Sequence, residues 1–208
     1  MNKQQTKKET YHHGRLREEL IRRGLDALER EGVEALSLRA LAEAAGVSKT
    51  APYRHFKNKD LFLGALADEG YRLLYEALAV SLETQKDKTV DESPLSLMGR
   101  TYMEFAVARP ALYRLMNSSL ICVMPNEYTG WARKSLQLLA QTLAAGNGAA
   151  PHTPDAGETE SIDLDITTAA WAYIHGLTMI RIDKLYPTDL PEPDWDRLMK
   201  IMLKIPIS

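Results

Sequence analysis

The chain has 208 residues, of which 45% are apolar and 26% are charged, and its formal net charge is −2. This length and composition allow one or two compact domains with a buried core. The one cysteine, Cys122, excludes an internal disulfide, and no apolar run approaches the roughly 18 residues of a membrane span. The first ten residues are polar and lack the apolar segment of a secretory signal. These features predict a cytoplasmic protein that does not contact membranes.

Charge is distributed unevenly along the sequence. Residues 1–64 contain 13 Lys and Arg against 9 Asp and Glu, whereas the remaining residues contain 13 against 19. A basic first third joined to an acidic remainder indicates two roles, one of which faces an anion.

The first predicted element is a helix over residues 14–31, because leucines recur at helical spacing until Gly32. A short helix follows it. Ser37 can serve as its N-cap, and Gly46 ends it at a position that often requires a positive φ.

Residues 47–56, VSKTAPYRHF, predict a short basic helix that contains a proline. If Ser48 or Thr50 caps this helix, Pro52 falls in or next to the first turn, where backbone N–H groups have no partner within the helix. The proline then starts a helix instead of breaking one. Its flat apolar ring could also meet a thymine methyl group.

Helical periodicity continues through the rest of the chain, and strand alternation is scarce. Asn58 can cap a long helix over residues 59–84. Further helices are predicted over residues 94–108, 110–123, 127–145 and 163–185 and from residue 194 onward. The predicted fold is all-α, with about nine helices in two domains. These are a three-helix helix-turn-helix domain with a basic N-terminal arm (residues 1–58) and a helical effector-binding and dimerisation domain (residues 59–208).

The two short helices, separated by AGVS, form the helix-turn-helix. Ala42 must be small where the second helix crosses it, Gly46 permits the tight turn, and Val47 fills the space between the helices. In the docking geometry of this motif, the second helix lies in the major groove of DNA. The residues at its N-terminal end then face the base edges: Lys49, Thr50 and Ala51.

GVSKTAPYRHFKNKDLFLGAL (residues 46–66) resembles the DNA-binding domain of TetR/AcrR-family repressors, which shows the pattern G-V-S-x-x-x-x-Y-x-[HY]-F-x-x-K. YHHGRLREELI resembles the first helix of one subgroup of that family. RPALYRLM and WAYIHGLTMI resemble segments of the subgroup's C-terminal WHG domain, which is named after a Trp-x-x-x-His-Gly pattern. The resemblance covers most of residues 11–65 and is patchy beyond residue 90. Pro52 stands where the family usually has an aliphatic residue.

The resemblance implies a ligand-responsive transcriptional repressor that binds a palindromic DNA operator as a homodimer and is released by a small-molecule effector. It adds contacts with phosphates and the groove wall to the predicted DNA-binding set. That set is Ser37, Arg39, Ser48, Lys49, Thr50, Ala51, Pro52, Tyr53, His55, Lys57 and Lys59. Dimerisation is expected through residues 163–186 and 194–205.

An effector pocket between the later helices would accept a small hydrophobic or aromatic molecule, and methionine adapts to such irregular shapes. The candidate lining is Met98, Tyr102, Phe105, Tyr113, Met116, Trp131, Trp171, His175 and Met179. The same side chains serve equally as core, and His175 could be structural, line the pocket or lie in the dimer interface.

An enzyme and a helical adaptor are the alternative functions. The sequence has no nucleophile–base motif, phosphate-binding loop or paired-carboxylate helix pattern, so catalysis is not expected. Adjacent His12 and His13 would point about 100° apart on a helix, with no third ligand nearby, so neither a metal nor another cofactor is expected. The basic first third disfavours the adaptor.

Overall fold

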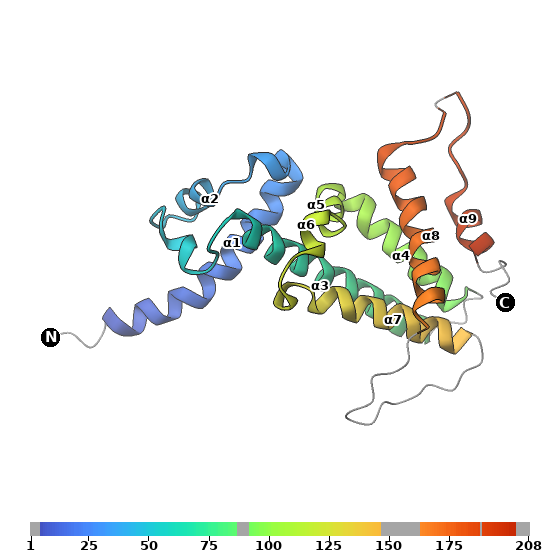
Figure 1. The fold of residues 1–208 in the computed structure, drawn as a ribbon, viewed down its shortest axis with the longest axis horizontal. Helices are drawn as coiled ribbons and strands as arrows, with labels where there is room; N and C mark the ends of the chain where they lie inside the picture. The colour runs from blue at the N-terminus through green and yellow to red at the C-terminus, as the bar shows by residue number, and fades with distance from the viewer. Residues whose placement is uncertain (1–4, 87–91, 147–162, 188, 203–208) are drawn as a thin grey trace. The chain divides into compact units, whose positions relative to one another are not determined.

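The computed structural model describes residues 5–86, 92–146, 163–187 and 189–202. Within these ranges the predicted all-α fold is confirmed, because every regular element is helical and no strand occurs (Figure 1). None of the helices in the described ranges combines the length and apolarity needed to cross a lipid bilayer. The contacts divide the chain into two units, Met1–Gly70 with Arg109–Gly130 and Tyr71–Ala108 with Trp131–Ser208.

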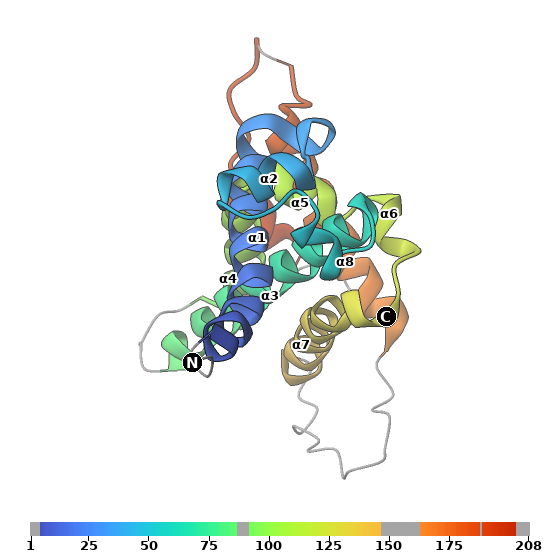
Figure 2. The ribbon, with the colours of Figure 1, turned by 90° about the vertical axis from the view of Figure 1, so that its left-hand side faces the viewer.

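The first unit is built on its longest helix, against which α2, η1 and α5 pack; Figure 2 shows α2 crossing α1. Its elements in chain order are α1 (Gln5–Ala35), α2 (Leu38–Ala44), the 3₁₀ helix η1 (Ala51–Arg54), the first part of α3 (Lys59–Lys86), α5 (Pro110–Met116), α6 (Ser119–Cys122) and the 3₁₀ helix η2 (Asn126–Tyr128). Gly32 has φ 79° and ψ 173°, so regular α-helical geometry stops there, as the sequence predicts.

The core of the first unit depends on close approach between α1 and α3. A Cβ atom on Gly24 would come within 2.5 Å of the Phe62 ring and 2.9 Å of Leu66, so glycine permits this packing. Phe62 also meets Phe56 edge to face, with ring centroids 5.0 Å apart, and both rings are fully buried. Aromatic pairs of this geometry stabilise by more than their buried area alone.

Glu29 ties α1 to the start of α5. Its carboxylate accepts hydrogen bonds from the backbone N–H groups of Leu112, at 2.8 Å, and Ala111, at 3.2 Å. The first N–H groups of a helix have no partner within it, and a negative charge there also suits the helix dipole. One side chain of α1 therefore caps a helix that lies more than 80 residues further along the sequence.

The second unit contains the rest of α3, with α4 (Pro94–Ala108), α7 (Gly130–Gly146), α8 (Leu164–Asp183) and α9 (Trp195–Met202). Helix α4 packs against both α8 and α9, and Met103, Ile174 and Met199 form a buried cluster between them. Asp163 caps α8 by accepting a hydrogen bond from the Ile166 N–H at 3.0 Å.

The single helix predicted over residues 110–123 is wrong. The structure divides it into α5 and α6 around Asn117 and Ser118. The Asn117 side chain donates to the Tyr113 carbonyl at 2.9 Å, and the Ser118 hydroxyl donates to the Leu115 carbonyl at 2.8 Å. Such local bonds between side chain and backbone compete with the helical hydrogen-bond ladder, which explains the break.

Gly46 generates a first prediction, because its φ of 69° is left-handed and a Cβ atom there would meet nothing within 4 Å. Gly46→Ala should lower the free energy of unfolding by about 1 kcal/mol through backbone strain alone. Gly46→Asn should cost less, since asparagine tolerates this conformation. Urea unfolding of both variants measures the difference, and equal losses would contradict a backbone cause.

Candidate nucleic-acid interface and ligand cavity

The turn after α2 has the geometry that the sequence predicts. The Ser37 hydroxyl accepts a long hydrogen bond, 3.5 Å, from the Ala40 N–H at the start of the helix. Ala42 is fully buried, and its carbonyl accepts from the Val47 N–H at 3.0 Å. With Gly46 in the left-handed region, the chain reverses within a few residues and presents the next segment at the surface.

The segment after the turn is a 3₁₀ helix of four residues, so the predicted α-helix is wrong in type. Pro52 has no N–H to donate to the carbonyl of Ser48, four residues earlier. That carbonyl accepts instead from the Ala51 N–H, three residues on, at 2.9 Å. Proline at the first turn thus starts a helix, as predicted, but favours the tighter 3₁₀ spacing. Thr50 precedes it without a capping bond from its side chain, and its hydroxyl lies 3.2 Å from that of Ser48.

Pro52 is buried, which contradicts the expectation that its ring could meet a thymine methyl group. Four residues later, Phe56 is only 1% exposed, with the Arg17 guanidinium 5.6 Å above its ring. These two residues anchor the turn to the unit. Pro52 is therefore a positioning residue and leaves the set of proposed DNA contacts.

The other predicted DNA-binding residues lie on or beside this turn. Tyr53 is 42% exposed although aromatic, whereas the Lys59 ammonium donates to the Glu34 carbonyl at 3.0 Å. The Asn58 side chain accepts from the Leu61 N–H at 2.8 Å, which confirms the predicted cap of α3. The exposed members of the set are Ser37, Arg39, Ser48, Lys49, Thr50, Tyr53 and Lys57, and the half-buried members are Ala51, His55 and Lys59.

Four exposed cations lie on η1, on the segments that flank it and on α2: Arg39, Lys49, Arg54 and Lys57. In the part of the chain that the structure describes, none of them forms an ion pair. Arg54 was missed by sequence reasoning, although it lies inside the basic stretch VSKTAPYRHF. Cations that have no ion-pair partner within the protein can bind the phosphates of a DNA backbone. These cations lie near the helix that is predicted to contact the bases.

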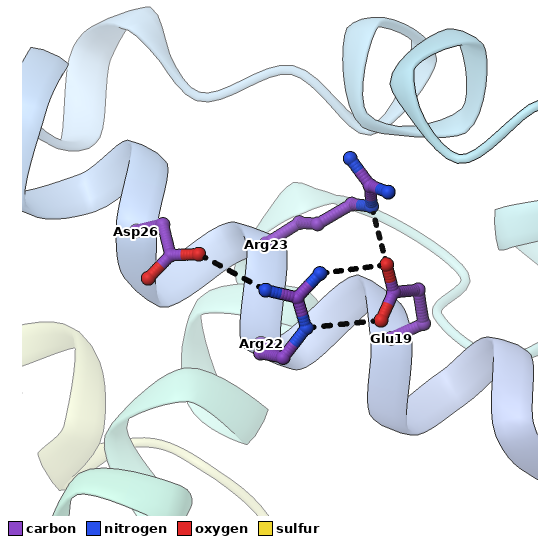
Figure 3. A network of polar contacts seen from close by, with 4 residues as sticks. All are labelled: Glu19, Arg22, Arg23 and Asp26. Carbon is purple, nitrogen blue, oxygen red and sulfur yellow. Dashed lines mark hydrogen bonds and ion pairs between the residues drawn. The ribbon is translucent and has the colours of Figure 1, made fainter.

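The cations of α1 are arranged differently (Figure 3). Arg22 and Arg23 both donate to Glu19, at 2.8 and 2.6 Å, and Arg22 also reaches Asp26 at 3.4 Å. Hydrogen bonds from Arg22 and Arg23 lower the pKa of the Glu19 carboxyl from 4.5 to about 2. The charge of this α1 surface is therefore balanced within the helix, and we do not include it in the candidate interface.

The second unit contains a partly open cavity of about 320 Å³ between α3, α4, α7 and α8. The side chains around it are predominantly apolar. They belong to Tyr71, Leu74, Leu78, Leu95, Met98, Gly99, Tyr102, Ala132, Arg133, Ser135, Leu136, Leu139, Thr168, Ala170, Trp171 and Ile174. This volume lies at the lower end of the roughly 300–1,000 Å³ of small-molecule sites, so the cavity suits a small ligand.

Three of the nine predicted pocket residues line this cavity, namely Met98, Tyr102 and Trp171. The other six do not. Tyr113 and Met116 are buried in the first unit, whereas Phe105, Trp131, His175 and Met179 belong to the second. The sequence missed the leucines of the lining, because their helical spacing is that of ordinary core residues.

Two family profiles match the chain. Residues 17–66 match the profile described as "Bacterial regulatory proteins, tetR family", and residues 95–204 match "Tetracyclin repressor-like, C-terminal domain". The chain belongs to the tetR family. The two matches are consistent with the predicted family, while the predicted WHG subgroup stays a prediction.

Similar proteins include members of the tetR family. The tetracycline repressor protein class C of Escherichia coli is 50% identical over 52 residues, which is 25% of this chain and 24% of that protein's length. A solved protein of unknown function from Rhodococcus sp. RHA1 is 27% identical, with a TM-score of 0.71, over 93% of this chain and 94% of that one. A tetR-family regulatory protein from Rhodococcus RHA1 shares the fold, with a TM-score of 0.59 and 20% identity over 90% and 95% of the two chains.

His175 lies beside the cavity on this tetR-family fold, with its ring centroid 5.4 Å from that of Trp171, which lines the cavity. Burial lowers the pKa of the imidazole below its ordinary value of 6.5. The folded state therefore favours the neutral ring.

A prediction on pH follows from this lowered pKa. The unfolded chain binds the proton more readily, so the contribution of His175 to stability is complete above pH ~6.5 and is lost as the pH falls below it. Between pH 8 and pH 5, the free energy of unfolding should fall more for the natural protein than for His175→Gln. Urea unfolding at fixed protein concentration measures both, and parallel pH profiles would contradict the role of His175.

Proposed function

We propose that this protein is a ligand-responsive transcriptional repressor that binds a palindromic DNA operator as a homodimer and leaves it when a small effector occupies the cavity. The observation that carries the proposal is the group of exposed cations around η1 that form no ion pair among the described residues. Residues 1–58 then form the DNA-binding part, and residues 59–208 the effector-binding and dimerisation part.

In this proposal the exposed N-terminal end of η1 enters the major groove. Ser48, Lys49 and Thr50 precede the 3₁₀ helix and face solvent, so they are the residues that contact base edges. Tyr53 and Lys57 follow on the exposed side and contact phosphates, together with Arg54. Contacts with phosphates set the register on the duplex, and the base contacts set its sequence.

The alternatives have weaker support. The lining residues that the structure describes include no carboxylate, imidazole or thiol that could act as a general base or nucleophile. An adaptor would leave the uncompensated cations around η1 without an explanation. The cavity and the basic turn together favour a regulator that senses a ligand.

Helix α8 supports the proposed dimer. Its buried stripe, which includes Thr167, Ala170 and Ile174, lies on one face of the helix. Exposed Ala169 and Ala172 lie on the opposite face with half-buried Gly176, and these small side chains allow a second helix to approach closely. A two-fold pair of α8 helices would bury this face and duplicate the reading turn, which matches a palindrome. Residues 203–205, also predicted for the interface, lie outside the described residues.

Release of DNA requires that the effector favours one of two conformations. Helix α3 is suited to carry this preference. It begins at Lys59, directly after the reading segment, and its later residues Tyr71, Leu74 and Leu78 line the cavity. A ligand packed against those three side chains would bias the position of a helix whose first turn follows the DNA-contacting residues.

DNA binding generates the next prediction, for which the operator is first selected from random DNA by the purified protein. Lys57→Gln should abolish the gel shift of that operator, because it removes an exposed cation next to η1. Any residual binding should show a salt dependence (log K against log salt) that is shallower by about 0.9 for each phosphate that the variant no longer neutralises.

Arg30→Gln is the matched control. Arg30 is also exposed and basic but is paired with Glu31 at 2.8 Å, so its removal should leave the shift unchanged. Light scattering should find the same dimer mass for both variants. A monomer produced by Lys57→Gln, or an equal loss of binding in both variants, would overturn the proposed division of roles.

The dimer interface is tested on the exposed face of α8. Ala172→Glu places a charge at the centre of the proposed contact and should convert the dimer to a folded monomer, since burying an unpaired carboxylate is costly. The control is Ala144→Glu, at an exposed site on α7. Light scattering reports the mass and circular dichroism the helix content; a dimeric Ala172→Glu variant would place the interface elsewhere.

A further inference from the structure

We infer that the effector is an amphiphilic monoanion: an apolar body of about seven carbons that ends in a carboxylate bound by Arg133. This inference rests on the proposed function, because it names the chemistry of the ligand that fills the cavity of the second unit. It is argued from the distribution of polarity, charge and volume in that cavity.

The protein side of the cavity is apolar. Leu74, Leu78, Met98 and Ile174 line it and are themselves buried, so the part of the cavity that they border is apolar and lies inside the unit. A polar group placed among these side chains would lose its hydration and find no hydrogen-bond partner, at a cost of several kcal/mol. The part of the ligand that occupies this space is therefore a hydrocarbon.

The charge of the lining has one sign. Arg133, on α7, is the charged residue among the described residues of the lining, which include no aspartate, glutamate, lysine or histidine. Arg133 both lines the cavity and is exposed, so it lies on a part of the lining that solvent can reach. A carboxylate at that position would keep part of its hydration while accepting hydrogen bonds from a planar donor that matches its geometry. Among the described lining residues, a ligand cation would find aromatic rings but no carboxylate, and Arg133 would repel it.

The other polar side chains reinforce the role of Arg133. Ser135 follows on the same helix, and its hydroxyl already donates to the Trp131 carbonyl at 2.9 Å. Thr168 is exposed and offers a neutral hydroxyl. Tyr71 and Tyr102 add neutral phenolic hydroxyls. Arg133 is thus the charged donor among the described lining residues, and it selects an anionic end over an alcohol or an amine.

The volume limits the length of the hydrocarbon. If each group of the ligand takes the ~30 Å³ of a water molecule in the liquid, about 320 Å³ holds about ten non-hydrogen groups. A carboxylate accounts for three of these atoms, counting its carbon, and the remainder is a chain or ring of about seven carbons. Octanoate has this size and serves as the probe.

The experiment is isothermal titration calorimetry of the full-length protein with octanoate, 1-octanol and octylammonium at neutral pH. These probes share one chain and differ in the charge of the head group. Octanoate should bind more tightly than 1-octanol by about tenfold or more, the gain expected from a hydrogen-bonded charge pair, and octylammonium should bind most weakly.

Arg133→Gln should reduce octanoate affinity to that of 1-octanol and leave 1-octanol unchanged, whereas Arg133→Lys should retain part of the preference. The control is Lys134→Gln. Lys134 is the neighbouring exposed cation; it lies 3.9 Å above the Trp131 ring and does not border the cavity, so octanoate binding should be unaffected.

Three results would overturn the inference: 1-octanol or octylammonium binding as well as octanoate, Arg133→Gln weakening octanoate and 1-octanol equally, and no heat from any probe at millimolar concentration. Gel shifts with the selected operator are run beside the titrations. A protein that shifts DNA but binds no octanoate refutes the inference alone. One that binds octanoate with Arg133 dependence but selects no DNA refutes the proposed function and leaves the ligand chemistry standing.

Discussion

The burial of Pro52 and Phe56 is the constraint that sets the orientation of η1 and of the proposed DNA-contacting residues before it. They lie four residues apart, at positions that a single turn brings to the same side, and both face the interior. Phe56 packs edge to face on Phe62 of α3, and Gly24 lets α1 approach that ring. Because these anchors hold the turn from within, Tyr53 and Arg54 between them and residues 48–50 before them are exposed. A segment too short to be stable as an isolated helix thus acquires one fixed orientation.

The charged residues that the structure describes in the first unit fall into two groups: those paired within the protein, mostly on α1, and the unpaired cations around η1. Two carboxylates of α1 are used internally: Glu19 accepts hydrogen bonds from two arginines of the same helix, and Glu29 caps the start of α5. These two carboxylates are therefore not available to the cations around η1, which form no ion pair among the described residues and can bind an external anion. A nearly neutral protein can in this way present a local basic surface, and it is the local charge that attracts a phosphate backbone.

Periodicity and terminal residues made most helices predictable. Gly46 and Asn58 have the predicted roles because each depends on local chemistry, a left-handed φ and an N-cap bond. Two kinds of feature were not predictable: those set by competition between side-chain and helical hydrogen bonds, and those set by packing against residues distant in the sequence. Asn117 and Ser118 break a helix whose apolar pattern continues through them, and the burial of Pro52 depends on neighbours from other helices. Likewise, a leucine that borders a cavity has the same spacing as one that fills a core, so the leucines of the lining gave no signal.

In the proposed ligand, the carboxylate provides specificity and the hydrocarbon provides the free energy for the conformational change. To move a two-state equilibrium from 1:99 to 99:1, a ligand must favour one state by about 5.5 kcal/mol. A hydrogen bond to a charged group such as Arg133 contributes about 1.5–3 kcal/mol, which distinguishes a carboxylate from an alcohol but cannot drive release alone. Burying about seven carbons at about 0.8 kcal/mol each supplies about 5.6 kcal/mol. The hydrocarbon must therefore provide most of the difference between the two states, through contacts with α3 such as those of Leu74 and Leu78 that exist in one state only. Arg133 therefore determines which amphiphile binds, and the apolar contacts determine whether binding shifts the conformational equilibrium.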